Sequence, residues 1–117
     1  MRRILAYCRV NCPHSDNTKN ILSNFNKVND KIKIDIISVS NNNEIKNNLK
    51  KLYNHDTFPI IVYKSKDDKS YTFGGNDKLM KTISKLDNLT TDKLKEYKNT
   101  MEYNDYKILK WLYYINK

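Results

Sequence analysis

The chain has 117 residues and a mass of 14.0 kDa, which is enough for one hydrophobic core and excludes two independent domains of ordinary size. Hydrophobic residues make up 38% of it, so a folded, soluble protein is expected. The formal net charge is +9, but no more than two lysines occur in succession, and no apolar run has the length of a membrane span. We therefore expect neither a nucleic-acid partner nor a membrane.

The first residues and the cysteines bear on the cellular compartment. Lysine, asparagine and isoleucine together supply 48 residues, and codons rich in adenine and thymine encode all three, so genome composition explains much of the lysine. The uncharged run of residues 4–8 is too short for the apolar region of a signal peptide. We expect a cytoplasmic protein, in a host cytoplasm or a virion if the gene is viral. In a reducing compartment, two cysteines favour reactive or metal-binding thiols over a structural disulfide.

The first half of the chain predicts two strand–helix units. The apolar run of residues 4–8 is typical of a buried strand, and Pro13 suits the first turn of the helix that follows. Residues 31–39 at first alternate between polar and apolar types, and residues 41–53 return to helical spacing. The positions expected to face the core are Ile21, Leu22, Phe25 and Val28 in the first helix, Ile32, Ile34 and Ile36 in the strand, and Ile45, Leu49 and Leu52 in the second helix.

The next segment predicts a hairpin and a third helix. Two short strands, residues 60–63 and 70–73, flank a polar loop, and the glycine pair at 74–75 ends the hairpin. Helical spacing follows at Leu79, Met80, Ile83 and Leu86. The order through about residue 87 is therefore β-α-β-α-β-β-α, and parallel strands joined by helices imply an α/β sandwich.

The C-terminal segment predicts at least one further helix, which begins after an N-cap at residues 90–92. It is rich in aromatic residues: Tyr97, Tyr103, Tyr106, Trp111, Tyr113 and Tyr114. One helix does not easily hide so much aromatic surface. Packing against the core is the simplest interpretation, and a dimer or partner face is the alternative.

Cys12 is the strongest candidate for chemistry. It precedes Pro13 at the start of the first predicted helix, where unpaired backbone N–H groups and the positive end of the helix dipole favour a thiolate. Arg9 adds a positive charge nearby, and such settings lower the pKa of a cysteine so that it is nucleophilic at neutral pH. Cys8 is expected to be a small buried strand residue, and a disulfide between Cys8 and Cys12 is the less favoured alternative.

Two further segments are candidates for a binding site. In residues 57–59, Thr-Phe-Pro, a proline at a strand entrance can hold a cis peptide bond and present the preceding backbone to an extended ligand. In residues 74–77, Gly-Gly-Asn-Asp, the glycines allow a ligand to approach the backbone. There Asn76 or Asp77 can cap the next helix and bind an amino or carboxylate group.

In this order and spacing, these segments resemble the glutaredoxin family of the thioredoxin fold. Residues 7–15, Tyr-Cys-Arg-Val-Asn-Cys-Pro-His-Ser, are similar to the family's active-site segment, in which Cys-Pro-aromatic-Cys or Cys-Pro-aromatic-Ser follows a tyrosine and a basic residue. Residues 57–59 are similar to its Thr-Val-Pro, and residues 74–79 to its Gly-Gly-x-Asp-Asp-Leu. The resemblance implies a three-layer sandwich with a four-stranded mixed central sheet flanked by helices. Residues 1–88 would form this domain, and residues 89–117 a helical extension packed on it or appended to it.

The resemblance also implies a role for each candidate residue. Cys12 would be the nucleophile in a motif completed by Pro13, His14 and Ser15, with glutathione as the co-substrate. The residues expected to bind glutathione are Arg9, Thr57, Phe58, Pro59, Gly75, Asn76 and Asp77, of which Arg9 would face a carboxylate and the last three the γ-glutamyl end. Since Ser15 stands where dithiol members have a second cysteine, a monothiol enzyme acting on glutathionylated proteins is implied. Val10, His14 and Lys78 also depart from the family pattern.

Three other functions would use the same residues. Monothiol members can bridge a [2Fe-2S] cluster between two subunits through the cysteine at the position of Cys12 and glutathione, but cluster carriers usually show Cys-Gly-Phe-Ser. Cys8, Cys12, His14 and His55 have the ligand types of a zinc site, yet their spacing matches no tight pattern, so we expect no metal and a solvated loop position for His55. A non-catalytic module that docks a partner through its aromatic segment is the third.

Overall fold

The computed structural model describes residues 2–25 and 32–115, so the predicted helical position Val28 lies outside the described residues. The elements follow the predicted order, and two helices come after it. They are β1 (Arg2–Arg9), α1 (Pro13–Ser23), β2 (Ile32–Val39), α2 (Asn43–Leu52), β3 (Ile60–Lys64), β4 (Ser70–Gly74), α3 (Asn76–Leu86), α4 (Thr91–Thr100) and α5 (Tyr103–Ile115).

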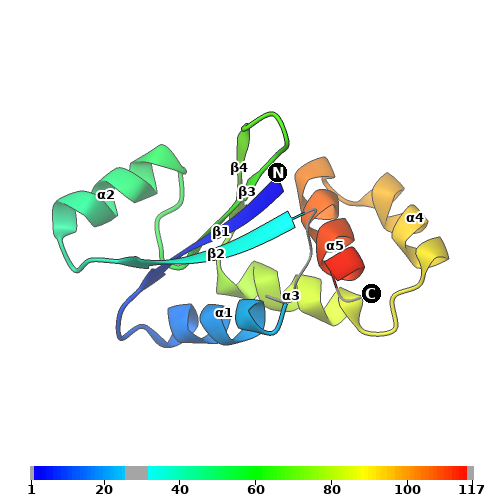
Figure 1. The fold of residues 1–117 in the computed structure, drawn as a ribbon, viewed down its shortest axis with the longest axis horizontal. Helices are drawn as coiled ribbons and strands as arrows, with labels where there is room; N and C mark the ends of the chain where they lie inside the picture. The colour runs from blue at the N-terminus through cyan, green and yellow to red at the C-terminus, as the bar shows by residue number, and fades with distance from the viewer. Residues whose placement is uncertain (1, 26–31, 116–117) are drawn as a thin grey trace.

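The four strands form one mixed sheet in the order β2-β1-β3-β4 (Figure 1). β1 pairs with β2 in parallel, while β3 is antiparallel to both β1 and β4. The parallel pair requires a crossover connection, which α1 provides. Helices lie on both faces of this sheet, and the predicted thioredoxin-like α/β sandwich with a four-stranded mixed sheet is confirmed.

One face of the sheet carries the main hydrophobic core. Ile4, Ala6 and Cys8 of β1 point into it, because successive side chains of a strand face opposite sides. Helices α1, α3 and α5 cover this face, as their positions in Figure 1 show. The buried residues that these helices add include Leu22, Leu79, Ile108 and Leu112. Of the predicted core positions, Leu22, Phe25, Ile32 and Ile34 are buried as expected.

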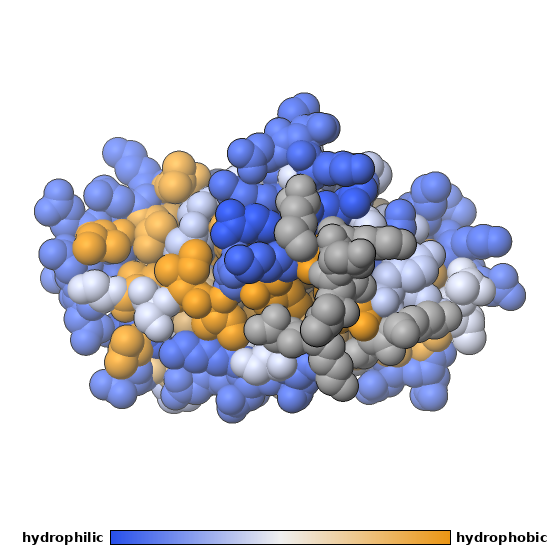
Figure 2. Space-filling view, in the orientation of Figure 1, coloured by the Kyte–Doolittle hydropathy of each residue, from blue (hydrophilic) through white to orange (hydrophobic). Residues whose placement is uncertain are grey.

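The opposite face of the sheet is only partly covered by a helix. Helix α2 lies there, and its Leu49 packs against a smaller apolar cluster, but none of its residues is buried. The prediction that Ile45 and Leu52 face the core is wrong, since they are 46% and 70% exposed. The apolar surface at the α2 end of the molecule is visible in Figure 2. Helical spacing identifies an apolar stripe, but it does not show whether a partner covers it.

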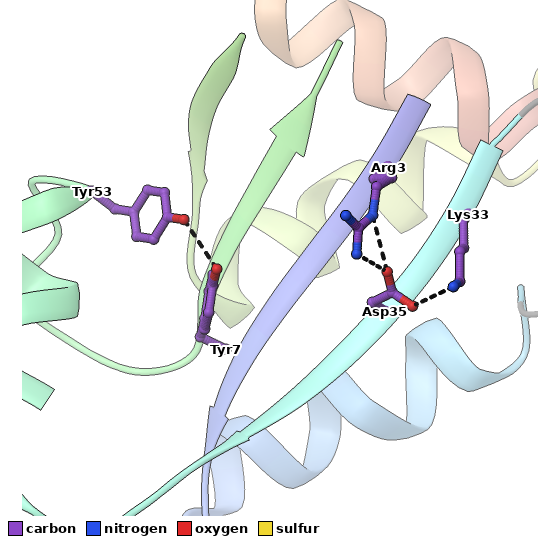
Figure 3. Close-up of polar contacts among 5 residues, drawn as sticks. All are labelled: Arg3, Tyr7, Lys33, Asp35 and Tyr53. Atoms are coloured by element: carbon purple, nitrogen blue, oxygen red, sulfur yellow. Dashed lines mark hydrogen bonds and ion pairs between the residues drawn. The ribbon is translucent and has the colours of Figure 1, made fainter. Parts of the chain in front are cut away.

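Polar contacts complete this face where the helix does not reach (Figure 3). Arg3 donates to Asp35 Oδ2 from Nη2 at 2.6 Å and from Nε at 3.1 Å, and Lys33 Nζ lies 3.6 Å from Asp35 Oδ1. Closer to α2, the hydroxyl oxygens of Tyr7 and Tyr53 are 3.0 Å apart and their ring centroids 5.3 Å apart. The tyrosine pair joins the C-terminal end of α2 to β1, two residues before Arg9.

The C-terminal segment consists of two helices, and the second belongs to the main core. Thr90 caps α4, as predicted, with its hydroxyl accepting from the Lys93 N–H at 3.2 Å. Of the aromatic residues, Tyr106, Trp111 and Tyr113 are buried. Tyr103 and Tyr114 are exposed. Within the described ranges, no helix combines the length and apolar character needed to cross a membrane.

Candidate active site

Cys12 lies at the N-terminus of α1 in a setting that stabilises a thiolate. It is the N-cap residue, its carbonyl accepts from the Asp16 N–H at 2.9 Å, and Pro13 occupies the first turn. Partial burial by itself would raise the pKa of this thiol. That effect is outweighed by the backbone N–H and hydroxyl of Ser15, the N–H of His14 and the charge of Arg9, so the pKa of Cys12 lies below its ordinary value.

Ser15 also connects the ends of the active-site segment. It is fully buried, and its hydroxyl oxygen accepts from the Arg9 backbone N–H at 3.0 Å. The hydroxyl proton is thereby left to donate, and a thiolate at Cys12 is the acceptor that it stabilises. The serine that stands in place of a second cysteine is thus a hydrogen-bonding group in contact with the nucleophile.

Cys8 has the opposite character. It is fully buried in β1, as predicted, and burial raises the pKa of its thiol to about 11. Both cysteines are free thiols. The chain therefore has one thiol poised to ionise and one held in its neutral form.

The loop between α2 and β3 approaches Cys12 from the other side. The Phe58–Pro59 peptide bond is cis, as predicted for this segment. Inside the loop, the ring nitrogen Nδ1 of His55 lies 2.7 Å from the Thr57 carbonyl oxygen, and Nδ1 therefore carries the donated proton. The other edge of the same ring faces Gly75, where a Cβ atom would lie 3.4 Å from His55 Cε1. His55 thus spans the space between this loop and the start of α3.

Two adjoining clefts bring the predicted residues together. The smaller, of about 280 Å³, is lined by Arg9, Cys12, His14, Lys50, Asp56, Thr57 and Phe58. The larger, of about 450 Å³, is lined by His14, His55, Thr57, Phe58, Pro59, Gly74, Gly75, Asn76, Asp77 and Lys78. His14, Thr57 and Phe58 border both, so a continuous groove leads from Cys12 to the N-terminus of α3.

The start of α3 differs from the predicted helix cap. The N-cap is Gly75, so the prediction that Asn76 or Asp77 caps this helix is wrong. Asn76 is buried, and its side-chain oxygen accepts from Asn17 Nδ2 at 2.9 Å and from Thr18 Oγ1 at 3.0 Å. Its side chain therefore ties α3 to α1, the helix that begins at Cys12, and its backbone N–H belongs to the first turn of α3.

A comparison with known protein families matches the glutaredoxin family over residues 4–67, more than half of the chain. This chain belongs to the glutaredoxin family. The matched segment contains both Cys12 and the cis proline Pro59. A search of curated proteins found no match. Membership in this family identifies the chain as a thioredoxin-fold redox protein. Glutaredoxins generally use glutathione as a co-substrate.

The glutaredoxin groove contains residues that the sequence did not suggest. Lys50 and Asp56 line the cleft at Cys12. Lys78, already noted as a departure from the family pattern, lines the larger cleft. His55 lies in the loop between α2 and β3, as predicted, and it is half-buried where it lines the groove. Lys50 and Asp56 occur in a polar stretch rich in lysine and asparagine, where a single sequence offers no signal that separates them from their neighbours.

The zinc interpretation fails on geometry. Within the described residues, no three His, Cys, Asp or Glu side chains gather as a metal site would require. The Cys8 side chain is buried in the main core on one face of the sheet, while His14 and His55 line the groove. The four residues considered as zinc ligands thus do not form a common site.

Proposed function

We propose that this glutaredoxin reduces mixed disulfides between proteins and glutathione by a monothiol mechanism. The observation that carries the proposal is the lowered pKa of Cys12 at the end of a groove, with Ser15 in place of a second cysteine. A lone activated thiol suits a reaction in which glutathione itself resolves the intermediate.

The proposed reaction has two disulfide exchanges. The Cys12 thiolate attacks the glutathione sulfur of the mixed disulfide, the original S–S bond breaks, and the protein thiolate leaves and takes up a proton. Cys12 is then joined to glutathione. A second glutathione thiolate attacks the glutathione sulfur of this intermediate, which releases oxidised glutathione and restores the Cys12 thiolate. Reduction of one mixed disulfide therefore consumes one free glutathione, and the oxidised glutathione released contains this molecule and the one supplied in the substrate.

The groove offers complementary groups to both ends of glutathione. Arg9 and Lys50 border the cleft at Cys12 and suit the glycine carboxylate. At the other end, the N–H groups of residues 76–78 precede the first bond of α3, from the Leu79 N–H to the Gly75 carbonyl, and suit the α-carboxylate of the γ-glutamyl group. Asp77, exposed beside them, suits its ammonium group. In between, the backbone of Phe58 would pair with the glutathione cysteine.

Turnover of a peptide–glutathione mixed disulfide tests the proposal. The assay supplies glutathione and its reductase and compares the wild type with Cys12→Ser and Cys8→Ala. We expect Cys12→Ser to abolish turnover and Cys8→Ala to keep it, since Cys8 is buried away from the groove. Wild-type protein that is folded but inactive, or activity that survives in Cys12→Ser, would refute the monothiol mechanism.

A further inference from the structure

Lys78 occupies an unusual place in the glutathione groove. It belongs to the first turn of α3 and lines the larger cleft, beside Gly75 and Asp77. Its aliphatic stem crosses Gly74, where a Cβ atom would lie only 3.0 Å from Lys78 Cδ. A positive charge in the first turn of a helix opposes the helix dipole, and here it also lies at the end of the groove expected to receive a carboxylate.

Helix α5 provides an ion-pair partner for Lys78. Lys78 Nζ lies 2.7 Å from Asp105 Oδ1 and 5.1 Å from the centre of the Phe73 ring. Asp105 is in the first turn of α5, and its side chain is only 19% exposed. Its backbone N–H also donates to Glu102 Oε2 at 3.1 Å. This hydrogen bond holds the backbone at the start of α5, a helix outside the segment that matches the family.

Helix α5, which carries Asp105, is packed into the main hydrophobic core. Ile108, Trp111 and Leu112, which follow it on the same helix, are buried in the main core together with Leu79 of α3. The helix that carries Asp105 and the helix that carries Lys78 are thus packed into one core. An ion pair between two such helices needs little further ordering of the backbone, and this favours its persistence in solution.

We propose that Asp105 is a positioning residue that sets the substrate specificity of the groove. By neutralising Lys78 and drawing its ammonium group toward α5, Asp105 leaves Asp77 and the α3 N-terminus to select a zwitterionic amino-acid end over a plain carboxylate. The inference rests on the proposed use of glutathione and specifies how its γ-glutamyl end is recognised. Without Asp105, the freed Lys78 would attract any carboxylate at this end of the groove.

The test compares two substrates that differ by one amino group. Peptide mixed disulfides are made with glutathione and with glutaryl-cysteinylglycine, which has the same carboxylates and lacks the ammonium group. For Asp105→Asn, we expect KM for the glutaryl substrate to fall by about three- to fivefold, the size of one partly exposed charge interaction, with kcat unchanged. Asp105→Glu should restore the wild-type preference. The matched control is Asp92→Asn, which removes an exposed carboxylate from the first turn of α4.

The role of Lys78 is tested by repeating the substitution in a second background. In Lys78→Met, Asp105→Asn should no longer change the ratio of the two KM values, because the charge on which it acts is gone. An unchanged ratio in Asp105→Asn alone, or an equal change in both backgrounds, would overturn the inference while wild-type turnover of the glutathione substrate still supports the proposed function. Absence of Cys12-dependent turnover in the wild type would instead overturn the proposed function, and this inference with it.

Discussion

The Arg9 backbone N–H and the Ser15 hydroxyl oxygen are joined by a hydrogen bond of 3.0 Å across the segment that contains Cys12. This bond orients the buried hydroxyl so that its proton is free to stabilise the thiolate. Ser15 therefore contributes to the lowered pKa of Cys12 both through its backbone N–H and through its side chain. A serine at this position cannot resolve a disulfide, but it assists the nucleophile that remains.

Ser15→Ala should make Cys12 less acidic. A hydroxyl that donates to the thiolate favours the charged form, so the loss of the Ser15 hydroxyl should raise the pKa of Cys12. The thiolate fraction at neutral pH would fall, and alkylation by iodoacetamide would slow. The rate of that reaction as a function of pH measures the change. Ser23→Ala, at an exposed position of the same helix, is the control, and a shared midpoint in both variants would contradict the role of the hydroxyl.

The buried thiol of Cys8 should weaken the fold at alkaline pH. Its pKa is raised to about 11 in the folded protein, above that of an unfolded thiol. Between the two values the unfolded chain releases the proton while the folded protein keeps it, so the free energy of unfolding falls as the pH rises from about 9 to about 11. At neutral pH both states keep the proton and this loss is absent.

Denaturant titrations at pH 7 and pH 10 would measure this effect. Cys8→Ala has no proton to release at this position, and it should lose less stability than the wild type between the two pH values. The comparison within each protein removes the constant effect of the substitution on packing. Equal losses in the two proteins would show that Cys8 does not titrate differently on unfolding.

Local patterns were enough to predict the parts of the site that depend on neighbouring residues. The thiolate setting of Cys12 follows from its place before Pro13 at a helix start, and the cis bond at Pro59 was expected from the resemblance of residues 57–59 to the glutaredoxin motif. The strand and helix order followed from hydrophobic periodicity, because each element presents a regular apolar face to the sheet. These features need no knowledge of distant contacts.

The remaining features depend on how distant segments meet. Lys78 and Asp105 are 27 residues apart in sequence, and nothing near either residue indicates the other. The Asn76 side chain was expected at a helix cap, but the proximity of α1 gave it two better partners in Asn17 and Thr18. For α2, periodicity gave the correct helix but the wrong burial of Leu52, since exposure depends on the reach of the sheet beneath it.

The C-terminal helix should be required for stability. Leu112 is fully buried in the main core, so Leu112→Ala should reduce the free energy of unfolding by about 2 to 5 kcal/mol. The same substitution at Leu52, which is 70% exposed on α2, should change it by less than about 0.5 kcal/mol. Chemical denaturation monitored by circular dichroism compares the two. Similar values for both variants would mean that α5 is not part of the cooperative core.

Asn76→Ala should affect both stability and substrate binding, because the Asn76 amide fixes the start of α3 against α1. The substitution leaves the Asn17 amide and the Thr18 hydroxyl without their shared acceptor, which should cost about 1 to 3 kcal/mol of stability. Displacement of the α3 N-terminus should also raise KM for the glutathionylated peptide several-fold.

The partner residue provides the decisive comparison for Asn76. In a Thr18→Val background, Asn76→Ala should cost less stability than it does alone, since one of the two donors has already been removed. Asn20 carries an exposed amide on α1, and Asn20→Ala should leave both stability and KM near the wild-type values. A fall in stability with no change in KM would show that Asn76 joins the helices without positioning the groove, and additive losses would show that it acts independently of Thr18.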